Sequence, residues 1–348
     1  MSAQDAEHVL SPLDQAHAHH LAGEDEAALR LAIACSRAAS DAPGPVALIA
    51  RILVDGEHTI VAGEVAVRLV DAFIRRGDLA QAVVAANIAL DAGEGFDPHL
   101  ETIAQAFGKG SPRIGAAMPK PPPLPKPPPI PPALAQAKGP QLYEMADNLL
   151  TQFMASNDPV SADSKLPDLP LFGSLEPEVL ARLLSAVRVE EVSGNNEVVP
   201  QGEEGHEAFV LARGLLRVIR HQGGDQTVLA QLGPGAIFGE MALVSAAPRS
   251  AAVVAMEPAQ LLVLAREELE RLAPEAPALG QQLATFCRGR MESNLVRHAR
   301  VLSGVPTAKR AELLNQFPSR MFDADQTLIE RGQEASAVYL IASGCVSV

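Results

Sequence analysis

Apolar residues recur at intervals of three and four along the first third of the chain, which is the spacing of one face of a helix. The pattern is clearest in four segments: Ala27–Ala39, Val46–Val54, Val65–Ile74 and Leu79–Leu90. We therefore predict that residues 10–107 form a series of helices.

Two turns in this region share a local pattern. Gly23 and Gly77 each follow a predicted helix, and alanine stands five residues further on in both cases, at Ala28 and Ala82. Glycine permits a tight turn and alanine lets the next helix pack closely. The pattern resembles the helix-turn-helix of tetratricopeptide repeats, but the copies are 54 residues apart instead of about 34. An irregular repeat module that contacts a partner protein and a plain helical bundle both remain open.

A proline-rich segment follows, in which ten of the fourteen residues from Pro119 to Pro132 are proline. Proline fixes φ and lacks the N–H donor, so this stretch is neither a helix nor a central strand. We expect a stiff polyproline II linker between modules that each have their own core. The alternative is a ligand for a proline-recognition domain.

The period changes to that of short strands from Val187 onward, with glycines between the runs. A helix is expected before them at Gln141–Ala155, another begins at Glu176, and a helical stretch follows from about Arg266 to Leu302. Many short strands with regular turns predict an antiparallel, jelly-roll-like β-roll. The predicted strands are Val187–Val192, Glu197–Pro200, Glu207–Leu211, Leu215–Arg220, Thr227–Leu232, Ala251–Met256 and Leu261–Leu264.

An internal repeat appears when the chain is shifted by 130 residues, which aligns 170–218 with 300–348 without a gap. Gly202 then meets Gly332, and Gly214 meets Gly344. We expect a second β-roll to begin near residue 304, with first strands that have no partners in this chain. The predicted fold class is α+β multidomain: an all-α helical-repeat module (1–110), a proline-rich linker (111–140), a β-roll domain with flanking helices (141–303) and the start of a second β-roll (304–348).

The most specific motif is Phe238-Gly239-Glu240, followed by a short helix and then Pro248-Arg249, with nine residues from the glutamate to the arginine. It closely resembles the phosphate-binding cassette of cyclic nucleotide-binding domains. A structural ion pair between Glu240 and Arg249 is the alternative. His206 departs from the family pattern, because an aspartate is frequent at that place.

The resemblance implies a ligand and a role for each residue. The guanidinium of Arg249 would bind the cyclic phosphate, since it can form two charge-assisted hydrogen bonds at once. Glu240 would accept a hydrogen bond from the ribose 2′-OH, and the hydroxyl of Ser250 would add a phosphate contact. The complete candidate site is Phe238, Gly239, Glu240, Met241, Ala242, Arg249, Ser250 and Ala251, with backbone contacts at Gly239, Met241, Ala242 and Ala251.

Charge and composition narrow the classes of partner. The net charge of −14 and the pI of about 5.1 weigh against nucleic acid or an anionic membrane as the main partner. No run of about 18 apolar residues predicts a membrane span, and Met1–Val9 does not resemble a secretory signal. Three distant cysteines form neither a disulfide framework nor a metal knuckle. A cytoplasmic setting is expected.

No catalytic or metal motif emerges from the chain. His17, His19 and His20 cluster, but no carboxylate or cysteine completes a metal site, so packed or solvated histidines are expected. We therefore predict a non-enzymatic cyclic nucleotide sensor without a metal, which binds cAMP or, alternatively, cGMP and contacts a protein partner through residues 1–110. The alternative is a helical-repeat scaffold whose β-rolls no longer bind nucleotide. Transcription regulation is disfavoured, because a second roll and not a DNA-binding domain follows the first. The oligomeric state stays open.

Overall fold

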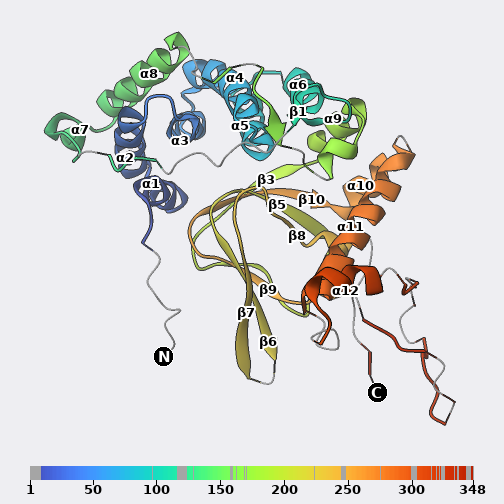
Figure 1. Cartoon of the computed structure of the whole chain (residues 1–348). Helices are drawn as coiled ribbons and strands as arrows, with labels where there is room; N and C mark the ends of the chain where they lie inside the picture. The colour runs from blue at the N-terminus through green and yellow to red at the C-terminus, as the bar shows by residue number, and fades with distance from the viewer. Residues whose placement is uncertain are drawn as a thin grey trace. The chain divides into compact units, whose positions relative to one another are not determined.

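A computed structural model of the chain shows the fold (Figure 1). The structure describes residues 9–95, 97–115, 124–127, 129–156, 160–161, 163–167, 169, 171–222, 224–243, 248–274, 276–298, 304–314, 316–318, 320, 322, 326–332, 334, 337–341 and 346–347. It divides into two compact units, residues 1–282 and 283–348, and each is described by itself.

The first part of unit one is a run of helices, as predicted. Their bounds are α1 Pro12–Leu21, α2 Asp25–Ala38, α3 Pro43–Asp55, α4 Thr59–Arg75, α5 Leu79–Asp91 and α6 Asp97–Phe107. Each helix packs against the next, and the fully buried residues of these helices include many leucines, isoleucines and alanines. At the start of α1, Ser11 accepts from the backbone N–H of Asp14, and the Asp14 carboxylate accepts from that of Ser11.

The turns that join these helices share one geometry. Gly23 and Gly77 have φ of +75° and +74°, so the similarity expected between these two turns is confirmed. The same positive φ occurs at Glu57 (+65°) and Gly93 (+92°). The turns at positions 23, 57 and 93, which close the α1–α2, α3–α4 and α5–α6 hairpins, are 34 and 36 residues apart. The spacing of 34 and 36 residues was not recognised in the sequence, because the middle turn has Glu57 where the other two have glycine.

A histidine links three of these helices. His20 Nδ1 lies 2.8 Å from Asp25 Oδ1, and its Nε2 lies 3.3 Å from Asp55 Oδ2. Burial lowers the pKa of His20, but the hydrogen bonds with Asp55 and Asp25 outweigh it and raise the pKa to about 9. The protonated imidazole of His20 therefore links α1 to the start of α2 through Asp25 and to the end of α3 through Asp55.

We expect His20→Gln to lower the free energy of unfolding by about 1–2 kcal/mol at pH 6. This is less than the full shift in the pKa of His20 implies, because solvent partly screens its contacts with Asp25 and Asp55. A raised pKa stabilises the fold fully below the unfolded value of 6.5, and this contribution disappears as the pH rises through about 9. Urea unfolding of both proteins at pH 6 and pH 9.5 checks this, with the exposed His221→Gln as control. An equal loss at both pH values would contradict the assignment.

The segment around the prolines is only partly a linker. Among residues 124–127 and 129–131 none is helical or in a strand, and Pro131 has the polyproline II angles φ −60° and ψ 148°. Helices α7 (Pro132–Gln136) and α8 (Pro140–Ala155) follow, and α8 packs on α2, α3 and α4. Arg30 Nη2 donates to the carbonyl of Ala137 over 2.7 Å. The end of the predicted linker is thus fixed to the helical module.

A β-roll of two sheets fills the second part of unit one. The strand orders of these two sheets are β3-β10-β5-β8 and β4-β9-β6-β7. Every pairing within the roll is antiparallel, and its described residues form no closed barrel. Seven strands match the predicted runs: β3 Arg188–Val192, β4 Glu197–Val199, β5 Glu207–Arg213, β6 Leu216–Gln222, β7 Asp225–Leu232, β9 Ala252–Ala255 and β10 Ala259–Ala265. The strand β8, Ile237–Phe238, was not predicted.

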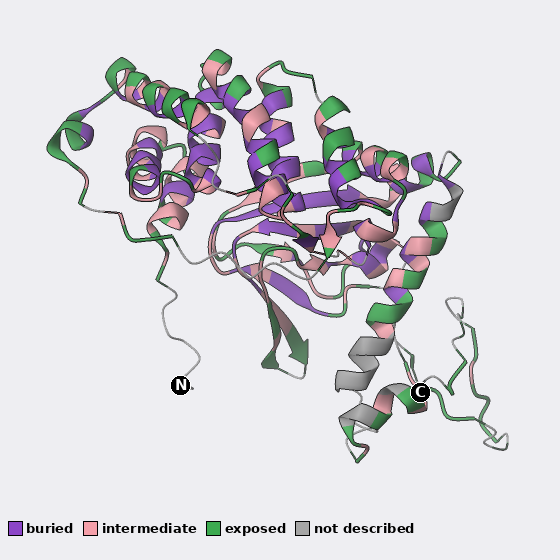
Figure 2. Ribbon diagram, turned by 45° about the horizontal axis from the view of Figure 1, so that its top comes forward, coloured by how far each residue is buried: buried purple, intermediate pink, exposed green. Residues whose placement is uncertain are grey.

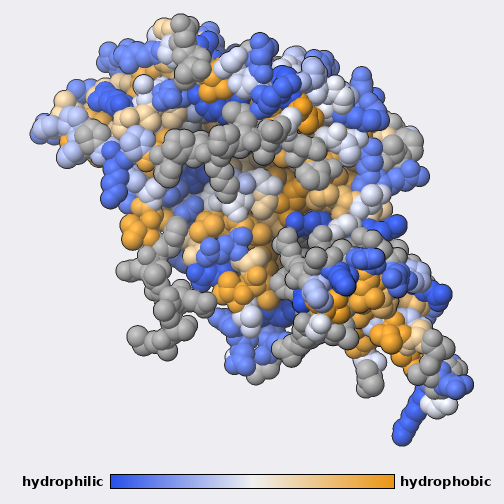
Figure 3. Space-filling model, viewed as in Figure 1, coloured by the Kyte–Doolittle hydropathy of each residue, from blue (hydrophilic) through white to orange (hydrophobic). Residues whose placement is uncertain are grey.

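The core of the roll lies between the two sheets. Phe209, Leu211, Leu261 and Val263 of one sheet pack with Leu216 and Val253 of the other, and all are buried. The β6–β7 hairpin extends away from this core, and its tip is hydrophilic (Figure 3).

Short elements connect the helices to the roll. Strand β1 (Ile114–Gly115) pairs in parallel with β2 (Leu166–Pro167), and a 3₁₀ helix η1 (Phe172–Ser174) precedes α9 (Pro177–Ser185). Helix α9 packs against α6 and against α10 (Arg266–Leu272). The N–H of Lys109 donates to the carbonyl of Leu175 over 2.8 Å. The roll has a core of its own, as expected, and the helices also pack against the region of the roll through α6 with α9 and α5 with β5.

The internal repeat has local structural support. Helix α11 (Pro277–His298) begins in the first unit and continues into the second, and α12 spans Thr307–Leu314. Helix α12 lies 130 residues after α9, and Gly332 has φ +92° where Gly202 has +87°. Among the described residues after 314 no strand is assigned. The boundaries at 110, 140 and 303 stay predictions.

Among the residues that the structure describes, none of the helices is both long and apolar enough to cross a membrane. In the part of the chain that the structure describes, no group of three histidine, cysteine, aspartate or glutamate side chains could hold a metal ion. His17, one of the clustered histidines, is buried instead.

Candidate functional site

The cassette connects β8 to β9 on the edge of a sheet. Strand β8 pairs with β5, and the rings of Phe238 and Phe209 stack with centroids 5.0 Å apart. Gly239 then turns the chain with φ +70°, and the 3₁₀ helix η2 (Glu240–Leu243) follows, as the short helix in the motif predicts. The left-handed φ explains why glycine stands before the helix. After this turn, η2 packs against β5.

Arg249 follows η2 in the cassette, and its side chain lies beside the turn at Gly239. Its Nη1 donates to the carbonyl of Gly239 over 2.9 Å, and its Nη2 donates to the carbonyl of Glu207 over 2.7 Å. Its Cζ lies 5.9 Å from the centroid of the Phe209 ring. The guanidinium is therefore held between the two ends of the cassette and strand β5.

The guanidinium of Arg249 is half-buried. Burial lowers its pKa, and the nearby carboxylates of Glu207 and Glu240 offset only part of this shift. A guanidinium has five donor hydrogens, and the hydrogen bonds to the carbonyls of Gly239 and Glu207 use only part of them. The arrangement can bind an anion that approaches along the remaining directions.

Two glycines make room for the guanidinium. A Cβ added to Gly205 would lie 2.2 Å from Arg249 Nε, and one added to Gly239 would lie 2.7 Å from Nη1. Gly239 was predicted as a site residue, whereas Gly205 was noted only as a turn residue.

The other predicted site residues lie around this center. Glu240, Ala242 and Ala251 are buried, Met241 is half-buried and Ser250 is exposed. Phe238 is buried in the core of the roll. The structure thus brings Gly239 and Arg249 into contact, while Phe238 stacks on Phe209 beside them, and the functional roles of these residues remain proposals.

Sequence reasoning missed Arg266, the first residue of α10. Its Nε donates to the carbonyl of Ala242 in η2 over 2.8 Å, and a second guanidinium nitrogen, Nη2, contacts the same oxygen. Its backbone N–H donates to the carbonyl of His206 over 2.7 Å. This residue fixes the end of η2 to α10, and no motif in the sequence signals it.

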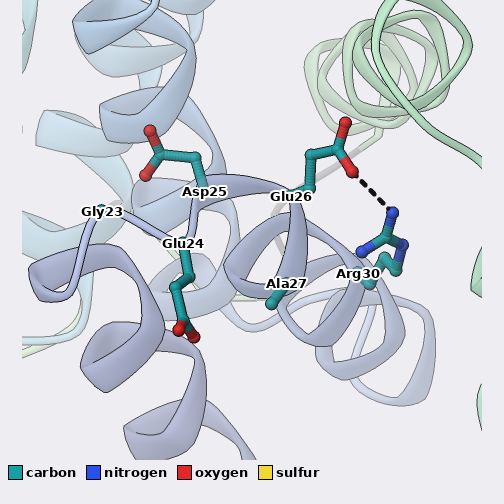
Figure 4. A pocket seen from close by; sticks show the side chains of 6 residues that line it. All are labelled: Gly23, Glu24, Asp25, Glu26, Ala27 and Arg30. Atoms are coloured by element: carbon teal, nitrogen blue, oxygen red, sulfur yellow. Dashed lines mark hydrogen bonds and ion pairs between the residues drawn. The ribbon is translucent and has the colours of Figure 1, made fainter.

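The pocket drawn in Figure 4 lies elsewhere, beside the turn between α1 and α2. It is lined by Gly23, Glu24, Asp25, Glu26, Ala27 and Arg30, and Arg30 pairs with Glu26 over 2.9 Å. None of the predicted site residues lines it.

Comparison with known proteins agrees with the motif. Residues 189–275 match the family model described as the cyclic nucleotide-binding domain. This segment is a cyclic nucleotide-binding domain. It contains the whole cassette from β8 to β9 and the strand β5 on which the cassette lies.

Relatives of the domain belong to regulatory proteins. The cAMP-dependent protein kinase regulatory subunit of Yarrowia lipolytica is 27% identical over 174 residues, which are 50% of this chain and 43% of that protein. The cyclic AMP receptor protein of Thermus thermophilus is 37% identical over 123 residues, 35% of this chain and 57% of that one. The chain therefore spans about half the length of the curated relatives it matches.

Among solved structures, the chain is similar to the co-crystal structure of the regulatory domain of Toxoplasma gondii PKA with cAMP. The two are 26% identical, and the match covers 41% of this chain and 51% of that chain, with a TM-score of 0.31.

Proposed function

We propose that the cassette of this chain binds a cyclic nucleotide, cAMP in preference to cGMP, and that the protein is a non-enzymatic sensor. The observation that carries the proposal is the placement of Arg249. A half-buried guanidinium lies across the cassette, held by two backbone carbonyls beside the buried Glu240, inside a cyclic nucleotide-binding domain. The names of the relatives, a regulatory subunit and a receptor protein, support the regulatory role.

Each predicted residue then has a chemical task. Arg249 binds the cyclic phosphate with its remaining donors, and Glu240 accepts from the 2′-OH. Phe238 fixes the cassette to β5, while the backbones of Gly239, Met241, Ala242 and Ala251 and the hydroxyl of Ser250 complete the contacts. No metal takes part in this scheme. We further propose that occupancy is relayed to a protein partner in the cytoplasm through residues 1–110.

Equilibrium titration of the full chain with cAMP tests the proposal against the scaffold alternative. If the protein is a sensor, one cAMP binds at the cassette between β8 and β9 with a measurable Kd. If it is a scaffold, this cassette binds no cAMP. Isothermal titration calorimetry gives both stoichiometry and affinity.

Removal of the carboxylate that faces the ribose has a moderate expected effect. We expect Glu240→Ala to weaken cAMP binding by about 5- to 30-fold, because the lost bond is to a neutral hydroxyl and is worth about 1–2 kcal/mol. Glu240→Gln retains an acceptor oxygen and should lose less. Wild-type affinity in Glu240→Ala would remove this residue from the site.

Base preference provides a second prediction. Ser250 is exposed next to Arg249, so its hydroxyl can reach a phosphate oxygen or a group on the base. We expect Ser250→Ala to weaken cAMP and cGMP equally and only a few-fold, since one neutral hydrogen bond is worth about 1 kcal/mol. Competition of the two nucleotides on both proteins measures the ratio. If cGMP wins on the wild type and loses its advantage in Ser250→Ala, the hydroxyl recognises guanine and the preference for cAMP is wrong.

A further inference from the structure

Strands β5 and β10 of the sheet β3-β10-β5-β8 have buried residues on both faces, which the roll alone does not explain. Phe209, Leu211 and Leu261 point into the core between the sheets. The alternate residues of β5 and β10 face the other way and are buried as well: Ala208, Ala212, Gln260, Leu262 and Leu264. Helix α5 packs on β5, and the strands nearest the helices are mostly buried (Figure 2). The outer face of β5 is therefore packed against helix α5 of the same chain.

An ion pair fixes α1 to the end of β5. Arg213 Nη2 lies 2.8 Å from Asp14 Oδ1, and the two side chains are only 15% and 16% exposed. The other oxygen of Asp14 accepts from the backbone N–H of Ser11 at the start of α1. Arg213 Nη1 donates to the carbonyl of Pro258. The carboxylate of Asp14 thus both caps the start of α1 and links this helix to the end of β5.

A second polar contact lies on α5. Gln81 Nε2 donates to the carbonyl of Ala212 and to Gln260 Oε1, each over 3.1 Å. Gln260 Nε2 in turn donates to Glu191 Oε1 over 2.7 Å. Gln81 and Gln260 are both buried. Separating the helix from the sheet would deprive these buried groups of partners, which makes the contact specific as well as apolar.

Strand β5 connects this interface to the nucleotide site. Its last residues, Ala212 and Arg213, contact the helices, and its first residues, Glu207 and Phe209, contact Arg249. The two ends are about 20 Å apart at 3.3 Å per residue. A helical module that restrains β5 therefore restrains the strand on which the cassette lies.

We propose that the N-terminal helical module docks in cis on the outer face of this sheet and that docking raises the affinity of the cassette for its nucleotide. The proposal rests on the proposed function of the cassette. Docking keeps β5 and β8 in the arrangement that orients Arg249, so the docked state binds the phosphate without first ordering the site. By linkage, the nucleotide strengthens docking by the same factor.

Two interface variants of the full chain test the proposal. Arg213→Glu places a like charge opposite Asp14, and Gln81→Leu removes the amide at nearly constant volume. We expect each to weaken cAMP binding by about five- to tenfold, the lower range of allosteric coupling. Arg271→Glu is the control, because Arg271 makes the same kind of ion pair with Glu268 on an exposed surface.

Hydrogen exchange of α5 and β5 measures docking independently of the nucleotide. We expect both interface variants to exchange faster there, and cAMP to slow exchange in α5 of the wild type but not of Arg249→Ala. Faster exchange with a Kd within twofold of wild type would overturn the coupling, and unchanged exchange in both variants would overturn the interface. A wild-type chain that binds no cyclic nucleotide would overturn the proposed function and the coupling together, while faster exchange in the variants would still establish docking.

Discussion

Arg249→Ala should weaken cAMP binding by about 30-fold to several thousandfold, the largest effect that we expect of a single substitution. Loss of a charged partner in a partly desolvated site costs about 2–5 kcal/mol, and each 1.4 kcal/mol is a factor of ten in Kd. The cost falls on the phosphate, which would face the carbonyls of Gly239 and Glu207 without the cation that lies between them. Calorimetric titration of the full chain measures it.

Arg249→Lys separates charge from geometry in the same experiment. Lysine keeps the positive charge but cannot bond two oxygens with a planar fork, so an affinity between those of wild type and Arg249→Ala is expected. Arg271→Ala, at an exposed position of α10, serves as the control for loss of an arginine. Binding by Arg249→Ala at wild-type strength, in a chain with an unchanged circular dichroism spectrum, would remove the guanidinium from the site.

Gly239→Ala has the second largest expected effect. A side chain at φ +70° costs about 1–3 kcal/mol in backbone strain. Its Cβ would also lie 2.7 Å from Arg249 Nη1 and 3.1 Å from the carbonyl oxygen of Glu207. Because the backbone oxygen cannot move away easily, the guanidinium must leave its position. We therefore expect at least a tenfold loss of cAMP affinity together with a lower thermal midpoint.

Gly233→Ala is the matched control for this substitution. Gly233 precedes the cassette, has no positive φ, and has no atoms near the place where a Cβ would stand. It should bind cAMP like the wild type. Equal affinities of Gly239→Ala and Gly233→Ala would show that the turn before η2 does not position Arg249.

Local patterns predicted much of this fold. Alternation of apolar residues and glycine-rich turns placed seven strands, because each strand of a β-roll has one face in the core. Strand β8 escaped detection because its two residues lie inside the cassette motif, where no alternation can develop. The turn at Glu57 escaped because its positive φ is carried by a residue that seldom adopts it.

The candidate site was predictable for a similar reason. Its glycine, glutamate and arginine lie within eleven residues of each other and form a recognisable motif. Arg266 lies outside this segment and acts through a backbone carbonyl, which has no sequence signature. The interface was unpredictable because its partners, Asp14 with Arg213 and Gln81 with Gln260, are 199 and 179 residues apart. Pairs so distant are brought together only by the tertiary fold.

The most direct test of a nucleotide at this cassette is the NMR signal of the Arg249 side chain in the full chain. The ¹⁵N–¹H resonance of its Nε is assigned as the signal lost in Arg249→Lys and is followed during a titration with cAMP. We predict that it shifts to saturation at one equivalent, while the Arg271 resonance stays in place. A cAMP complex that leaves the Arg249 signal unmoved would contradict the central claim, as would the absence of any shift at millimolar cAMP.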